Sequence, residues 1–124
     1  MPAEFPLHSD FQVYASAART GTPTATVYDN PAHLGVVALI HCTASAATPS
    51  VVFTIQGELG GVYYDILASA AVTGAVDIVM RVYPGLVAVA NLAISHPLPR
   101  RWRILATHAD ADSITYNVES CLIK

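Results

Sequence analysis

The stretch VVFTIQGELGGVYYDILA, residues 51–68, decides the fold of this chain. Two runs rich in β-branched and aromatic residues, Val51–Glu58 and Val62–Ala68, flank the pair Gly60-Gly61. A glycine pair adopts the positive φ angles of a tight hairpin turn without steric cost, and the flanking composition is typical of strands. The stretch therefore predicts a β-hairpin.

Further strand-like segments lie on both sides of this hairpin, separated by turns rich in Pro, Gly, Asp and Asn. They are Phe11–Ala17, Thr24–Tyr28, Gly35–Thr43, Ala75–Tyr83, Arg100–Thr107 and Ile114–Ile123. The segment Leu86–Ser95 permits a helical turn, a loop or a strand. About eight short strands at regular spacing predict an all-β fold, an antiparallel β-sandwich of the jelly-roll type.

Two of these segments carry a more specific prediction. Gly35–Thr43 is almost continuously apolar, so we expect a central strand that is covered on both faces. Alternation in Phe11–Ala17 predicts two faces, with Phe11, Val13 and Ala15 on one and Gln12, Tyr14 and Ser16 on the other.

The chain divides into an N-terminal arm, residues 1–10, and a sandwich domain, residues 11–124. Pro2 and Pro6 interrupt regular structure in the arm. Phe5 and Leu7 are apolar anchors, which we expect to dock on the domain itself or on a neighbour. The arm lacks a basic segment followed by an apolar one, so no signal peptide is expected.

Composition excludes several classes of function. The 124 residues are 53% hydrophobic but only 12% charged, with a net charge of -3. Six Lys and Arg residues neutralise few phosphates, so we expect no nucleic-acid partner. The longest apolar run, Leu34–Cys42, is far shorter than the roughly 20 residues that cross a bilayer, so we expect no membrane partner. So few charges favour a surface that is covered by a partner or by other copies.

No motif for catalysis, phosphate binding or a cofactor is recognisable, and we expect neither an enzyme nor a cofactor. The best metal hypothesis is the HADADS stretch, with His108, Asp110 and Asp112. A calcium loop needs more oxygen ligands than this stretch offers, so a hairpin turn capped by its Asp side chains is favoured. Cys42 and Cys121 are expected to be buried thiols, with a bridge between them as the alternative.

Three arginines near the C-terminus, Arg100, Arg101 and Arg103, make up half of the basic residues. Alternation places Arg101 and Arg103 on one face of a strand and Trp102 on the other. Two interpretations stay open: a cationic patch for an acidic partner surface, or a solvated face with one Arg paired to a neighbouring Asp. Six tyrosines and the single Trp also allow a sugar-binding platform.

Four runs of the sequence resemble small virion structural proteins of tailed bacteriophages. These runs are ASAARTGTPTA, ATPSVVFTIQGELGGVYYDILASAAVTG, MRVYPGL and LPRRWRILATHADADSITYNV. The resemblance covers the chain from Tyr14 to Ile123. The N-terminal arm, Cys42 and Cys121 lie outside the pattern.

The resemblance implies a capsid decoration, or cement, protein. Such proteins bind the major capsid protein on the outer face of an icosahedral head, often as homotrimers, and stabilise the shell against internal DNA pressure. This chain would then be made in the host cytoplasm and lie on the outer capsid surface of the virion. The alternatives are a tail or head–tail connector structural protein and a carbohydrate-binding β-sandwich for adsorption. The candidate interface residues are Phe5, Leu7, Phe11, Arg100, Arg101 and Arg103.

Overall fold

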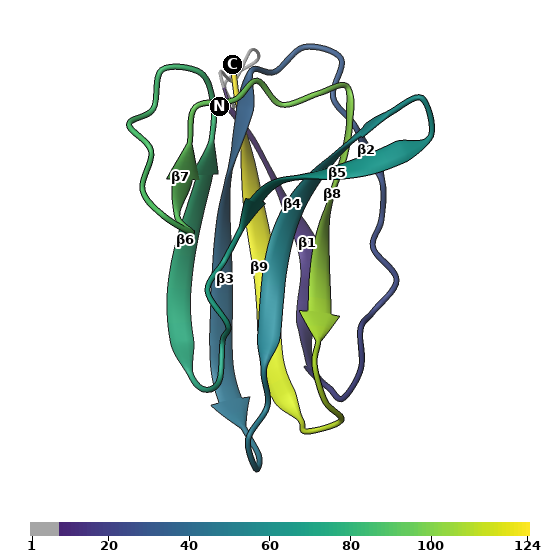
Figure 1. Ribbon diagram of the computed structural model, residues 1–124, viewed down its shortest axis with the longest axis vertical. Coiled ribbons are helices and arrows are strands. Elements are labelled where there is room, and N and C mark those ends of the chain that lie inside the picture. The colour runs from purple at the N-terminus through teal and green to yellow at the C-terminus, as the bar shows by residue number, and fades with distance from the viewer. Residues whose placement is uncertain (1–7) are drawn as a thin grey trace, which may run out of the picture.

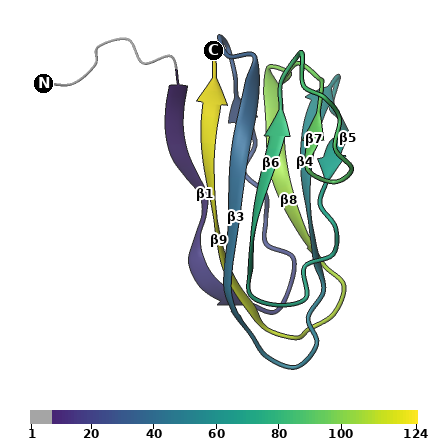
Figure 2. The same cartoon turned by 90° about the vertical axis from the view of Figure 1, so that its left-hand side faces the viewer.

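The computed structural model describes residues 8–124, which form nine strands in two facing sheets (Figures 1 and 2). The first sheet has the order β1-β9-β3-β6-β7, and the second has the order β2-β8-β4-β5. The strands are β1 (His8–Arg19), β2 (Tyr28–Asp29), β3 (Gly35–Ser45), β4 (Val51–Leu59), β5 (Val62–Ala68), β6 (Val76–Val82), β7 (Ala93–Ile94), β8 (Arg101–His108) and β9 (Ile114–Ile123). The all-β sandwich expected from the sequence is confirmed.

Strand pairing is nested around the predicted hairpin. β4 and β5 form this hairpin, β3 pairs with β6, β2 with β8 and β1 with β9, all antiparallel. Only β7 runs parallel to its neighbour, β6, among the named strands. This nested order is consistent with the predicted jelly-roll topology. Within residues 8–124, no helix is of a length and apolarity that could span a membrane.

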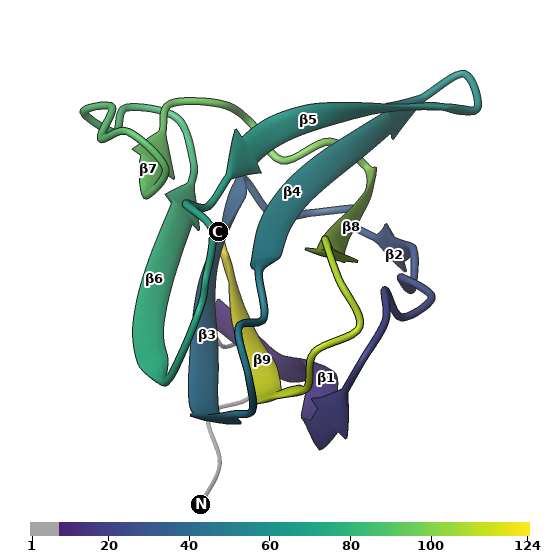
Figure 3. The same cartoon turned by 60° about the horizontal axis from the view of Figure 1, so that its bottom comes forward.

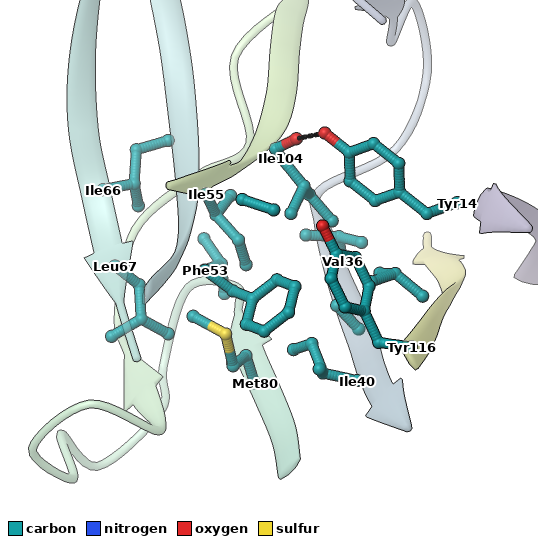
Figure 4. Close-up of a cluster of buried hydrophobic side chains, with 14 of the residues drawn as sticks. Tyr14, Val36, Ile40, Phe53, Ile55, Ile66, Leu67, Met80, Ile104 and Tyr116 are labelled. Carbon is teal, nitrogen blue, oxygen red and sulfur yellow. Dashed lines mark hydrogen bonds between the residues drawn. The ribbon is translucent and has the colours of Figure 1, made fainter. Parts of the chain in front are cut away.

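The inner faces of the two sheets form one core (Figure 4). The Phe53 ring from the second sheet packs edge-on against Tyr116 from the first, with ring centroids 5.0 Å apart. Tyr14 crosses the same space, and its hydroxyl donates a hydrogen bond of 2.7 Å to the Ile104 carbonyl oxygen. Burial raises the pKa of both tyrosines, so both phenols stay neutral in the fold. The core therefore joins the two sheets by apolar packing and by a sheet-to-sheet hydrogen bond.

The predicted alternation in β1 is wrong. Phe11 lies opposite Ser120 and Tyr14 lies opposite Val118, and the register shifts between Gln12 and Tyr14. This irregularity inserts one extra residue, so Phe11 and Tyr14 both lie on the core side although they are three positions apart. The strand also begins at His8, inside the segment that the sequence assigned to the arm.

The predicted strand Thr24–Tyr28 shrinks to β2, Tyr28–Asp29. The chain passes from one sheet to the other before this point, so most of the segment has no neighbouring strand. Just before the segment, the Thr22 hydroxyl accepts a hydrogen bond of 2.9 Å from the His108 N–H.

The ambiguous segment Leu86–Ser95 is mostly loop, with only β7 as strand. Gly85 has a φ of 91° and Asn91 a φ of 66°, and these left-handed positions interrupt both helix and strand.

The prediction that Gly35–Thr43 is covered on both faces is also wrong for the part of the chain that the structure describes. β3 is central, between β9 and β6, and its inner residues Val36, Ala38 and Ile40 are fully buried. Its outer face remains open, because the second sheet packs on one side only, and Leu39 is 37% exposed.

The fold predicts a large cost for removing Trp102. The indole is fully buried and packs against the rings of Phe11 and Tyr28, at centroid distances of 6.0 and 5.2 Å. We expect Trp102→Ala to lower the free energy of unfolding by about 3–5 kcal/mol, measured by urea denaturation. Tyr63→Ala, which removes an aromatic ring from the outer face of the second sheet, serves as the comparison. A loss for Trp102→Ala no larger than that for Tyr63→Ala would contradict this structure of the core.

Candidate interaction surface

The three arginines lie where β8 begins, and two of them are ion-paired within the chain. Arg100 Nε is 3.2 Å from Asp29 Oδ1, and Arg101 Nε is 2.7 Å from Glu58 Oε1. The side chains of Arg100 and Arg101 are 74% and 60% exposed, so water weakens these attractions. Their charges are nevertheless balanced locally by carboxylates.

Arg103 belongs to a polar network on the outer face of the second sheet. Its Nε donates a hydrogen bond of 2.8 Å to Gln56 Oε1, and Gln56 Nε2 donates one of 2.8 Å to Asp65 Oδ1. Its guanidinium carbon lies 3.6 Å from the centroid of the Tyr63 ring. As predicted, Trp102 lies on the opposite face, in the core. The arginines therefore form a polar, charge-balanced face, and their role in a contact stays a prediction.

The other candidate interface residues belong to the N-terminal arm and to the strand that follows it. Phe5 and Leu7 lie outside the described residues. Phe11 is half-buried, and its ring packs 4.9 Å from the ring of Tyr28, centroid to centroid. Much of its side chain therefore stabilises this chain's own domain.

The aromatic residues do not gather into an open platform around Trp102. The Trp102 indole is fully buried, as is Tyr116. The Arg103 guanidinium lies over Tyr63. Trp102 is therefore not accessible for stacking on a sugar ring.

The HADADS stretch forms the turn between β8 and β9. Asp110 Oδ1 accepts a hydrogen bond of 3.1 Å from the Asp112 N–H, and Asp112 Oδ2 accepts one of 3.2 Å from the Thr48 N–H. These carboxylates cap backbone groups, as the turn interpretation expects. Among the side chains of residues 10–124, no three His, Cys, Asp or Glu side chains cluster in a way that could hold a metal ion.

The two cysteines lie on opposite faces of the first sheet. Cys42 is buried in the core, where burial raises the pKa of its thiol to about 11. Cys121 is half-buried on the outer face, opposite Val37 of β3. No disulfide joins these two residues in the described chain.

A surface that the sequence did not reveal lies at one end of the sandwich. Leu34, Ile123 and the end of β6 meet at this end, since Leu34 N–H donates to the Ile123 carbonyl oxygen and Val36 pairs with Val82. Six of the eight large hydrophobic side chains that are exposed in the described chain lie at this end: before β3, on either side of the β4–β5 turn, and in the β6–β7 loop. We call this set the apolar end; its members are Leu34, Leu59, Val62, Val87, Val89 and Leu92.

The β4–β5 hairpin holds one part of the apolar end away from the body of the domain (Figure 3). Gly60 and Gly61 have φ angles of 60° and 84°, which fit the predicted tight turn. Glu58 Oε2 accepts a hydrogen bond of 2.8 Å from the Gly61 N–H and holds the tip. Leu59 and Val62, on either side of the turn, are 65% and 68% exposed.

The β6–β7 loop presents the second part. Val87 is 83% exposed. Asn91 Nδ2 donates a hydrogen bond of 2.9 Å to the Ala68 carbonyl oxygen, and Gly85 N–H donates one of 3.0 Å to Ser95 Oγ. These bonds fix both ends of the loop. A run as apolar as Leu86–Leu92, directly after a Pro-Gly turn, could have signalled a loop with exposed apolar side chains.

Comparison of the chain with protein-family models found no match, and comparison with curated proteins found no significant match. The function is therefore inferred from the surfaces of the molecule and from its sequence pattern.

The environment of the His108 ring leads us to expect that the fold is less stable in acid. Its Nε2 lies 2.9 Å from the Tyr116 hydroxyl oxygen. Burial lowers the pKa of His108, and Arg19 adds to this effect, whereas Asp110 opposes it. His108 therefore binds a proton more readily in the unfolded chain than in the folded one. The stability that neutral His108 contributes is complete above about pH 6.5 and is lost as the pH falls through the lowered folded value.

We expect the free energy of unfolding, measured in urea, to fall as the pH is lowered below about 6.5. In His108→Gln, this pH-dependent loss of stability should be smaller. His96→Gln removes an imidazole from the connection before β8 and serves as the control. An equal pH dependence in the wild type and in His108→Gln would contradict the assignment.

Proposed function

We propose that this protein is a capsid decoration protein, which binds the outer surface of an icosahedral phage head and stabilises it without catalysing a reaction. The observation that carries the proposal is the apolar end. Six large aliphatic side chains face water on connections at one end of a domain that has very few surface charges. The hairpin tip and the β6–β7 loop lie on opposite sides of this end (Figure 3), and each presents exposed aliphatic side chains of the kind that a protein partner covers.

The energetics of the apolar end suit attachment to a repeating lattice. Full burial of a Val or Leu side chain contributes about 1.5–3 kcal/mol, but association costs several kcal/mol in lost freedom. A few such side chains therefore support modest affinity for a single copy. On a shell, many copies act together, and the summed stabilisation resists internal pressure although each contact is weak.

The hydrogen bonds of the apolar end reduce the cost of binding. The Glu58 carboxylate holds the hairpin tip, and Asn91 holds the β6–β7 loop. Side chains on fixed connections lose less conformational freedom on binding than side chains on a free segment. The sequence pattern that resembles virion structural proteins supports the major capsid protein as the proposed partner.

Co-sedimentation with expanded, undecorated heads of the cognate phage tests this function. We expect saturable binding at a fixed ratio to the major capsid protein, and little binding to isolated tails. Val87→Asp and Val62→Asp place a charge at the contact, and we expect each to weaken binding at least about tenfold, because an unpaired buried charge is costly.

Ala111→Asp introduces the same charge in the β8–β9 turn, outside the apolar end, and should bind heads as the wild type does. Binding to tails alone would favour the connector alternative. Equal head binding by all four proteins would contradict a contact through the apolar end.

The N-terminal segment is proposed as a second contact with the shell. Because β1 begins at His8, a variant that lacks residues 1–7 keeps every described strand. We expect it to unfold at the same urea concentration as the full chain and to bind heads more weakly, since Phe5 and Leu7 are removed. Unchanged head affinity would show that the segment makes no contact.

A further inference from the structure

The outer face of the first sheet is a second surface that residues 10–124 leave uncovered, and it is distinct from the apolar end. A shallow groove of about 390 Å³ crosses β1, β9 and β3 on this face. Its outward-pointing lining residues are Asp10, Val37, Leu39, Glu119 and Cys121, and Phe11 and Ser120, whose side chains face the core, complete the lining. The near-continuous apolar sequence of β3 is typical of a strand that is covered on both faces. Within residues 10–124, however, nothing covers the outer face of β3.

Two opposite charges lie at the ends of one row across this face. Strand pairing places Asp10 beside Cys121, Cys121 beside Val37, and Val37 beside Arg81. All four residues alternate with core residues and therefore point outward. Within residues 10–124, neither the Asp10 carboxylate nor the Arg81 guanidinium has an ion-pair partner. The row is acidic at the β1 edge, apolar in the middle and basic on β6.

Such a row is complementary to itself. We propose that two copies of this protein pack through the outer faces of their first sheets, about a two-fold axis that runs parallel to the strands. This rotation leaves each row at the same height along the strands. It reverses the order of the strands across the sheet, so that β6 of one copy faces β1 of the other. Arg81 of each copy then lies opposite Asp10 of the other, and Val37 and Cys121 meet in the centre. A two-fold contact uses the same patch on both copies, which is what a self-complementary row provides.

The neighbouring polar groups of this face are hydrogen-bonded within the chain. Glu119 Oε2 accepts hydrogen bonds of 2.7 Å from Gln12 Nε2 and 3.0 Å from Asn117 Nδ2. The His41 ring and the Asp77 carboxylate, on β3 and β6 of the same sheet, are hydrogen-bonded to each other. Asp10 and Arg81 are therefore the charges that gain a partner when two faces meet. Sheets commonly pack face to face in this aligned manner.

Sedimentation equilibrium of the full chain tests this pairing, and the measurement needs no phage particle, so it is independent of the proposed function. We expect twice the monomer mass at high concentration. Arg81→Asp and Asp10→Arg each place like charges opposite one another, and each should raise the dissociation constant of the dimer at least about tenfold. The double variant exchanges the two charges and should restore the constant to within about threefold of the wild type.

Asp110→Arg changes the charge by the same amount as Asp10→Arg but lies in the β8–β9 turn, and it should leave dimerisation unchanged. Circular dichroism checks that each variant is folded. Four results would overturn the pairing: a monomer at all concentrations, a trimer, a double variant as weak as the single ones, or dimerisation only after residues 1–7 are removed. The last result would mean that the chain's own N-terminal segment covers the face.

Discussion

The packing of the two inner sheet faces is the constraint on which the rest of the structure depends. Phe53 and Tyr116 meet edge to face at its centre, and the Tyr14 hydroxyl joins the first sheet to the backbone of β8. A sandwich of only two layers buries one face of each sheet. The outer faces and the connections must therefore be polar or be covered by something else. The outer face of the second sheet is polar, since Arg101 and Arg103 contact Glu58, Gln56 and Tyr63 there.

The outer face of the first sheet and one end of the sandwich are partly apolar, and residues 10–124 leave them uncovered. Leu39 on the outer face and Val87 in the β6–β7 loop remain exposed although the chain is rich enough in apolar residues to fill its core. A composition with 12% charged residues leaves few groups to cover such areas with polarity. The two uncovered surfaces suit two different neighbours. The apolar end lies on fixed loops and fits a foreign surface, whereas the row from Asp10 to Arg81 is complementary to itself.

Local sequence predicted most strands, because hydrophobic alternation and turn residues act over short distances. Val62–Ala68 and Ile114–Ile123 were placed to the residue, and Gly60-Gly61 forms the tight turn that glycine permits. The faces of β1 were not predictable, since the irregularity before Tyr14 arises from its pairing with β9, which is distant in sequence. The open face of β3 was missed for the same reason: an apolar run indicates that a strand is to be covered but not which molecule covers it. The ion pairs of Arg100 and Arg101 were not predictable from local sequence either, since their partners come from other strands.

We propose that this domain decorates the outside of a phage head. The most direct measurement is a cryo-electron microscopy reconstruction of the cognate particle, compared with one from a phage that lacks this protein. We expect density of the size of this sandwich at repeated positions on the outer capsid surface, with the loops that carry Val62 and Val87 against the major capsid protein, and empty positions in the deletion particle. Identical heads in the two reconstructions, or a difference confined to the tail, would contradict the account.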